Sequence, residues 1–142
     1  MIALACGPSP YAKRMKGHMM NGFKFKTFAS ERSRRTQNSG VMVEADGNKY
    51  YGRLTDILEV DYHGSYKVVV YRCDWVDIVT GIEYSGSRTR VSFSKLIHTG
   101  RYLTDEPFII SSQATQVFYV KDKSKNGWNY VVETKPRDLF EV

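Results

Sequence analysis

The sequence predicts an all-β fold, a small antiparallel barrel or sandwich, on three observations. Short runs of β-branched and aromatic residues recur about every ten residues, which is the strand spacing of such folds. Turn-forming glycines separate these runs, and no stretch places apolar residues at helical spacing. A chain of 142 residues is long enough to bury a core of its own, so one domain is expected.

The N-terminal segment begins with turn-forming residues and a small basic cluster. Residues 1–17 are expected to be irregular or to form a short helix. In the run that follows, apolar and basic residues alternate, with Phe23 and Phe25 on one face and Lys24 and Lys26 on the other. Period-two alternation predicts a strand with one basic face.

A loop separates this strand from the main body of the chain. Residues 29–40 show no apolar face and are expected to be an exposed loop. The sequence therefore predicts two parts, an irregular basic N-terminal arm over 1–40, packed on or flanking the body, and a β-barrel domain over 41–142.

The middle of the chain holds the clearest strand. A short strand at 41–43 is followed by Asp46-Gly47, a strong hairpin signal. Residues 49–62 have mixed apolar spacing, so a bulged strand and a helix both fit, and the β-rich neighbours favour the strand. Residues 66–75 are β-branched and aromatic throughout, which is typical of a central strand.

The remaining strands are expected to be shorter. Residues 76–88 form a polar excursion, and 121–127 form a charged hairpin tip. Strand-like runs occupy 89–93, 105–110, 116–120 and 128–134.

The net charge of +6 belongs entirely to the first third of the chain. Residues 1–49 hold nine basic and three acidic residues, whereas residues 50–142 hold twelve of each. A neutral body with a basic arm is typical of proteins that bind a polyanion, above all nucleic acid. A solvated, solubilising segment is the alternative.

Membrane, disulfide-linked and metal-bound classes are not expected. No window approaches the roughly 18 consecutive apolar residues that a membrane helix needs, and the start of the chain lacks a signal-peptide pattern. Cys6 and Cys73 lie too far apart for zinc-finger spacing. The common catalytic and cofactor motifs are absent, so we expect a protein that is not an enzyme and that needs no cofactor.

One acidic cluster leaves an enzymatic alternative open. A metal-dependent nuclease would need Asp56, Asp74 and Asp77 to converge on paired metal ions. Solvated or strand-pairing carboxylates account for the same residues without any chemistry.

The basic residues of the arm form the first candidate binding site. They would pair with phosphates while the interleaved phenylalanines stack on bases. In the alternative, the phenylalanines belong to the core and the cations solvate the opposite face. The candidate nucleic-acid-binding residues are Lys13, Arg14, Lys16, Lys24, Lys26, Arg32, Arg34 and Arg35.

Aromatic residues form the second candidate site. At the rim of a small barrel, three rings and an acid would enclose a methylated lysine through cation–π contacts. Core packing and cross-strand pairing are the alternative for the same rings. The pocket residues would be Tyr50, Tyr51, Tyr71, Trp75, Asp74 and Asp77.

Several motifs together resemble one plant family. They are Gly22-Phe-Lys-Phe-Lys-Thr27, Arg35-Thr-Gln-Asn-Ser-Gly-Val41, Tyr50-Tyr-Gly-Arg-Leu-Thr-Asp-Ile57, Val69-Val-Tyr-Arg-Cys-Asp-Trp-Val-Asp77, Asp105-Glu-Pro-Phe-Ile-Ile-Ser-Ser-Gln-Ala114, Gln116-Val-Phe-Tyr119 and Lys135-Pro-Arg-Asp138. In order and composition they resemble the plant domain of unknown function numbered four-two-one-six, over nearly the whole chain. That family is found with the transposases of CACTA (En/Spm-class) DNA transposons and in host genes derived from them.

The resemblance implies a plant source, a nuclear location and an accessory role in a transposase or a transposase-derived protein. The catalytic acids of the transposase would lie in another domain. The implied partner is DNA, with a chromatin peptide or other parts of a transposase as alternatives, and no membrane. Residues 50–54 followed by 68–75 also look like an SH3-like or bromo-adjacent-homology-like barrel, which would make the chain a chromatin or protein-interaction module.

Overall fold

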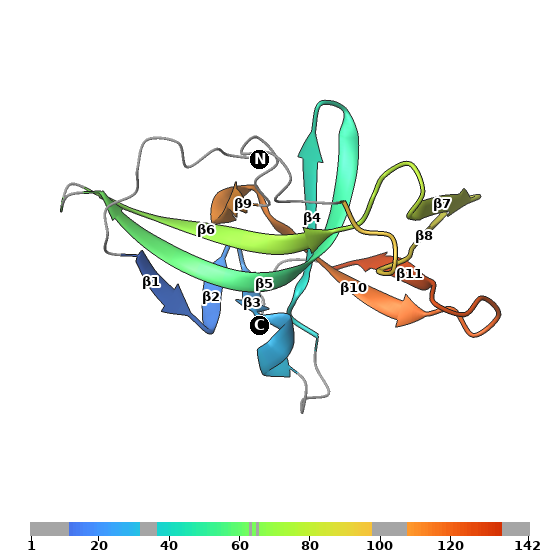
Figure 1. Cartoon of the computed structure of the whole chain (residues 1–142), viewed down its shortest axis with the longest axis horizontal. Coiled ribbons are helices and arrows are strands. Elements are labelled where there is room, and N and C mark those ends of the chain that lie inside the picture. Colours follow the sequence, from blue (N-terminus) through green and yellow to red (C-terminus); the bar gives the residue numbers. More distant parts are fainter. Residues whose placement is uncertain (1–11, 32–36, 63, 65, 98–107, 135–142) are drawn as a thin grey trace, which may run out of the picture.

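The fold is all-β (Figure 1) in the computed structural model, which describes residues 12–31, 37–62, 64, 66–97 and 108–134. Within these residues lie eleven strands and two short 3₁₀ helices, η1 (Phe28–Glu31) and η2 (Ser111–Gln113). Every strand pair is antiparallel. The predicted all-β, antiparallel class is therefore confirmed. Over the same ranges, no helix has the length and apolar character to cross a membrane.

Two long strands, β5 (Asn48–Tyr62) and β6 (Tyr66–Trp75), run side by side across the molecule (Figure 1). The register between them shifts between Leu54 and Asp56, which marks a β-bulge. The bulged strand predicted for 49–62 is therefore confirmed, and the helical alternative is wrong.

Three shorter strands border this pair. β4 (Gly40–Ala45) pairs with the first half of β5, and β1 (Ala12–Met15) pairs with its second half. β9 (Phe108–Ile110) pairs with the far edge of β6. The hairpin between β4 and β5 turns at Asp46 and Gly47, both with positive φ, as the sequence predicts.

Two hairpins extend the sheet beyond β4. One consists of β7 (Ile82–Ser85) and β8 (Arg88–Val91), and the other of β10 (Thr115–Lys121) and β11 (Asn129–Glu133). The strand order is β7-β8-β11-β10-β4-β5-β6-β9, and over the described residues no pairing joins β7 to β9. Closure into a barrel therefore stays a prediction. Strand β7 lies inside the predicted polar excursion, so that expectation is wrong for 82–85, where pairing with β8 forms a hairpin.

The N-terminal segment is more ordered than the sequence predicts. Residues 12–15 form β1, so the expectation of an irregular segment or a short helix is wrong there. The partner that makes β1 a strand is the edge of β5, which lies more than 40 residues away in the sequence. β2 (Gly17–Met20) and β3 (Phe23–Lys26) form a separate hairpin. In β3, Phe23 and Phe25 are buried and Lys24 is exposed, which confirms the predicted alternation.

The core consists of two apolar clusters. The first includes Phe25, Leu54 and Trp75, and it lies beneath β5 and β6. The second includes Val117 and Tyr119, and it lies between β4 and the two-hairpin end of the sheet. Strand β5 contributes to both clusters and therefore holds the two ends of the molecule together.

Candidate nucleic-acid interface

The predicted basic residues of the described arm lie on β1, β3 and the bend between β1 and β2. Lys13, Arg14, Lys16 and Lys24 are exposed, and Lys26 is partly buried. The other three predicted residues, Arg32, Arg34 and Arg35, lie outside the described residues.

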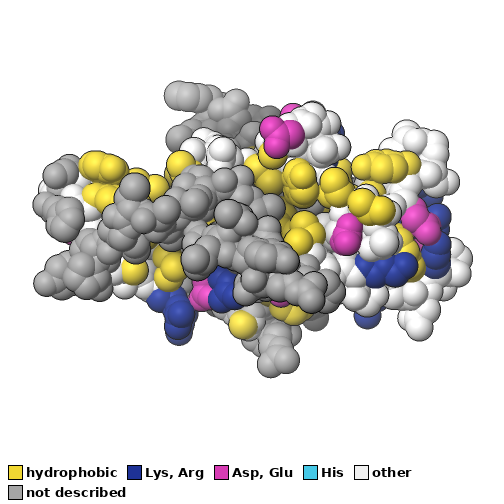
Figure 2. Space-filling model, turned by 45° about the horizontal axis from the view of Figure 1, so that its top comes forward, with side chains coloured by type: hydrophobic (Ala, Val, Ile, Leu, Met, Phe, Trp, Pro, Cys, Tyr) yellow, Lys and Arg dark blue, Asp and Glu magenta, His cyan; other side chains and the backbone are white. Residues whose placement is uncertain are grey.

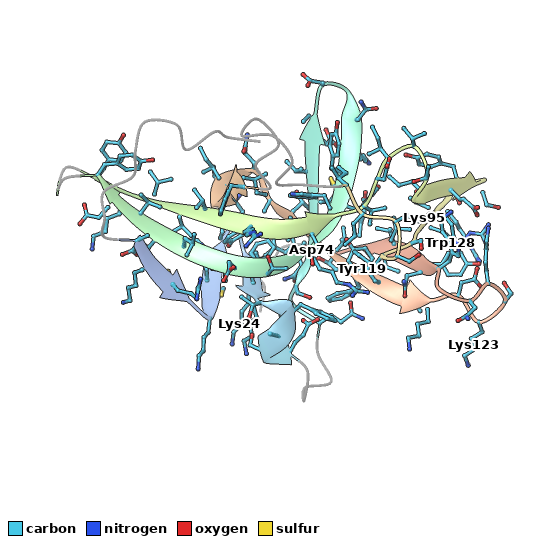
Figure 3. All side chains as sticks on the ribbon, viewed as in Figure 1. Lys24, Asp74, Lys95, Tyr119, Lys123 and Trp128 are labelled. Atoms are coloured by element: carbon cyan, nitrogen blue, oxygen red, sulfur yellow. The ribbon has the colours of Figure 1, made fainter. Side chains whose placement is uncertain are left out.

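The apolar face of β3 determines where its lysines point. Phe25 is fully buried, and its ring centroid lies 5.1 Å from that of Tyr71. Since side chains alternate along a strand, Lys24 must project from the opposite face, and Figure 3 shows it directed away from the sheet. The backbone of β3 is held in place because the Lys24 carbonyl accepts hydrogen bonds from Gln116 Nε2 (2.7 Å) and Asn38 Nδ2 (3.1 Å).

Three of these cations have no carboxylate partner among the described residues. Arg14 Nε lies 3.1 Å from a carboxylate oxygen of Asp56. Lys13, Lys16 and Lys24 form no ion pair with any residue that the structure describes. Their charge is therefore available to an anionic partner.

One carboxylate, that of Glu31 in η1, holds the residues just before β4. Glu31 accepts hydrogen bonds from the backbone N–H of Asn38 (2.7 Å) and from the Ser39 hydroxyl (2.6 Å). Gln37 also binds the backbone of Tyr119, donating to its carbonyl at 2.8 Å and accepting from its N–H at 3.1 Å. Glu31 thus fixes the backbone just before β4.

The rings of the predicted aromatic pocket belong largely to the core. Trp75, Tyr71 and Tyr51 are 1%, 0% and 3% exposed, so the open pocket predicted around them is wrong and the core-packing alternative holds for these three. Tyr71 and Trp75 pack with Phe25 in the first core cluster, and Tyr51 belongs to the second. The other predicted members, Tyr50, Asp74 and Asp77, remain partly or fully exposed.

His18 is joined to this core from β2. Its Nδ1 lies 2.7 Å from the Tyr71 hydroxyl, and the two rings meet edge to face. Burial lowers the pKa of His18, against a smaller opposing effect of Glu59. The same burial raises the pKa of Tyr71 far above its usual range. Both groups therefore stay neutral at neutral pH, as a packing contact requires.

The carboxylates of the nuclease alternative do not form a metal site. Asp56 is engaged by Arg14 and, at 3.9 Å, by Arg72. Asp77 accepts a hydrogen bond from the Val79 N–H at 2.8 Å, which shapes a turn. Across the described part of the chain, no three His, Cys, Asp or Glu side chains come together as metal ligands would.

The structure reveals a second basic region that the charge count along the sequence does not. The described residues 82–97 and 115–134 include six basic and three acidic residues. Figure 2 shows Lys and Arg side chains gathered at the right-hand end of the molecule, where Figure 1 places β7 and β8. The sequence count hides this region because 40–62 and 66–75, in β4 to β6, hold four basic and six acidic residues.

An ion-pair network stabilises this second region from within. Arg90 lies 2.9 Å from Asp122 and 3.2 Å from Glu83, and Lys125 lies 2.6 Å from Glu83. Hydrogen bonds from Ser124 and Arg90 lower the pKa of Asp122 to about 2. Arg88, Lys121 and Lys123 form no ion pair with the described residues and stay exposed.

Comparison with known proteins gives a family but no activity. Neither the curated proteins nor the solved structures contain a match to this chain. Residues 58–131, just over half of the chain, match the family described as "Domain of unknown function (DUF4216)". The match runs from the second half of β5 into β11, so it covers the second basic region and excludes β1 to β3. It is also the family that the sequence motifs resemble. The chain therefore belongs to the DUF4216 family of domains of unknown function.

Proposed function

We propose that the chain is a non-catalytic, nucleic-acid-binding accessory module of a transposase or a transposase-derived protein. In this proposal the basic strands β1 to β3 contact DNA phosphates. The transposase setting, the plant source and the nuclear location rest on the motif resemblance described above.

One observation carries the proposal. Lys13, Lys16 and Lys24 are solvent-facing cations without a carboxylate partner among the described residues. Lys13 and Lys24 lie on β1 and β3, and Lys16 lies in the bend after β1; β1 pairs with β5, and β3 is held by its buried Phe25 and by Gln116. Cations held on paired strands lose little freedom when they meet a phosphate, and each contact releases counterions from the DNA. Phosphate contacts of this kind position a protein on DNA without reading its sequence.

The bent sheet also supports a finer assignment of the fold. We propose that it belongs to the SH3-like or bromo-adjacent-homology-like barrels. Its support is the path of β5, which contributes to both core clusters and bends between its hairpin with β4 and the stretch that pairs with β1 (Figure 1).

The function is tested by titrating a labelled duplex of about 20 base pairs at several salt concentrations and following fluorescence anisotropy. Each phosphate contact contributes about −0.9 to the slope of log affinity against log salt. Replacing Lys13, Lys16 and Lys24 together by alanine should weaken binding and reduce the slope by about 2 to 3.

A matched control removes two cations that already have carboxylate partners. Lys49 lies 3.4 Å from Glu133, and Lys67 lies 3.6 Å from Glu59. The Lys49→Ala, Lys67→Ala variant should bind the duplex nearly as the unmodified chain does. Binding that is insensitive to salt, or that survives the triple substitution unchanged, would show the proposal to be wrong.

A further inference from the structure

The sheet formed by β7, β8, β11 and β10 has an outer face that β3 borders at Gln116 and on which Val120 and Val132 are exposed. We infer that this face binds single-stranded nucleic acid, with Phe118 and Tyr130 as platforms on which bases stack. The inference rests on the proposed function, since both take nucleic acid as the partner. It specifies that the nucleic acid is single-stranded, and it adds a second contact surface.

The register of β10 and β11 defines the face. Phe118 lies opposite Val132, and Val120 lies opposite Tyr130. Opposed and alternate residues of an antiparallel pair share one face. Tyr119 lies between Phe118 and Val120 and therefore points to the other face. It is 8% exposed and donates its hydroxyl to the Gly52 carbonyl at 2.8 Å. The face with Tyr119 is therefore the core side, and the face with Phe118 is the outer side.

This outer face is apolar and open. Val120 is 51% exposed and Val132 is 43% exposed. Phe118 and Tyr130 are partly exposed, so each ring keeps contact with solvent. Single exposed apolar residues are ordinary on a protein surface, whereas four neighbours on one face of a sheet mark an interaction site.

Cations border the face beside β8. The guanidinium carbons of Arg88 and Arg90 lie 5.5 Å and 5.9 Å from the centre of the Tyr130 ring. Arg90 is neutralised by Asp122 and Glu83. Arg88 is exposed and, among the described residues, has no carboxylate partner. If a base stacked on the Tyr130 ring, Arg88 would lie close enough to pair with a phosphate of the same strand.

Cations also border the two ends of β10. Gln116, which shares the face of Phe118, donates its side-chain N–H to the Lys24 carbonyl at 2.7 Å, so β3 lies at the start of β10. Lys123 lies in the turn beyond its end. Figure 3 shows Lys24 and Lys123 both directed to the lower side of the molecule. The apolar face therefore lies between the basic strands and the second basic region.

Rings and cations arranged in this way complement a single strand. Its bases offer π faces that a ring can stack on, and its phosphates lie within reach of flanking cations. In a duplex the bases are already stacked on one another, so the rings would have no partner. An apolar surface of a protein would leave the bordering cations without counter-charges.

The test compares a labelled 20-residue oligothymidylate with a duplex of the same length, by anisotropy with the full chain. Phe118→Leu and Tyr130→Leu keep an apolar side chain but remove the ring. Each should weaken binding of the oligothymidylate by about 5- to 100-fold and change duplex affinity by less than about twofold. Tyr130→Phe keeps the ring and should keep the affinity.

A tyrosine of the same sheet provides a matched control. Tyr84 on β7 is 71% exposed and lies opposite Thr89. Thr89 is the neighbour of Arg90, which lies opposite Tyr130. Because neighbouring residues of a strand point to opposite faces, Tyr84 does not share the face of Tyr130. Tyr84→Leu should change neither affinity. Far-ultraviolet circular dichroism and thermal unfolding of every variant would show that the fold is retained.

Three results would overturn the inference. Equal binding of both nucleic acids, unaffected by Phe118→Leu and Tyr130→Leu but weakened by the lysine triple substitution, would leave the proposed function standing alone. Binding of neither nucleic acid would remove both proposals. Reversible self-association in sedimentation velocity, abolished by Val120→Lys, would assign the face to a second copy of the chain.

Discussion

Two charged side chains illustrate how single residues hold this sheet together. The Arg53 guanidinium lies 3.7 Å from the centre of the Phe93 ring and 4.6 Å from that of Phe28. Burial lowers the pKa of Arg53, against smaller opposing effects of nearby acidic groups that include Glu31. The Asp122 carboxylate is 4% exposed and binds both Arg90 and Ser124. Neither the Arg53 stack nor the Arg90–Asp122 ion pair follows from the sequence, because each joins residues that lie far apart in the chain.

Arg53→Lys should destabilise the protein by about 1 kcal/mol, because a lysine ammonium, unlike the planar guanidinium of arginine, has no flat face that can stack between two rings. Urea unfolding followed by tryptophan fluorescence measures the loss. Arg72→Lys is the control, since Arg72 is an exposed arginine of the neighbouring strand with a 3.9 Å contact to Asp56. Equal losses in the two variants would contradict a stacking role for Arg53.

Stability should fall as the pH is lowered below about 4, in part because of Asp122. Its pKa is about 2 in the folded protein, whereas an unfolded aspartate titrates near about 3.9. The stabilisation is therefore complete above the unfolded value and is lost as the pH falls toward about 2. Urea midpoints measured between pH 6 and pH 2.5 test this. Asp122→Asn should be less stable at pH 6 and should show a flatter pH dependence; an identical pH profile would refute the assignment.

At the scale of elements, the strands with strong local patterns are the ones the sequence predicts. β6 is β-branched and aromatic throughout, and its predicted range and observed range coincide. β5 has mixed spacing because a bulge between Leu54 and Asp56 shifts its alternation. β1 and β7 are defined by pairing with distant or neighbouring strands, β5 and β8, and three of the four residues of β1 are exposed, so no apolar face marks it in the sequence.

Gly52→Ala should destabilise the fold by about 1 to 3 kcal/mol, as overpacking in a core does. An added Cβ would lie 2.8 Å from the Asp74 carbonyl and 2.8 Å from the Trp75 ring. Neither neighbour can move without disturbing the pairing of β5 and β6. Thermal unfolding measures the effect. Gly17→Ala is the control and should cost less, since its nearest neighbour, the Phe25 carbonyl, would lie 3.3 Å away. A smaller loss at Gly52 than at Gly17 would contradict the close approach.

At the scale of the whole molecule, charge is divided into zones rather than confined to an arm. The sequence places the entire net charge of +6 in residues 1–49. In the fold, a basic zone on β1 to β3 and another on the two-hairpin end flank a middle that is slightly acidic. Charges that cancel in a running count along the chain do not cancel on the surface, because the turns separate them in space.

The two basic zones should act separately on a single strand. Replacing Arg88, Lys121 and Lys123 together by alanine should reduce the salt slope of oligothymidylate binding by about 2, at about −0.7 per phosphate contact. The substitution should leave the slope for the duplex nearly unchanged. Anisotropy titrations at four salt concentrations would measure both slopes. Equal reductions for the two nucleic acids would show that the second zone does not distinguish them.

The sequence by itself determined the all-β class, the central strand, the Asp46-Gly47 turn, the outward direction of Lys24 and the family. These depend on residues close together in the chain, where alternation and turn chemistry act directly. Only the tertiary structure decided that Trp75 is enclosed and that 12–15 form a strand. It alone also brought Lys24 to the border of the Phe118 face. The reason is physical: burial and strand pairing depend on partners tens of residues away, and a local pattern holds no information about which partner the chain will meet.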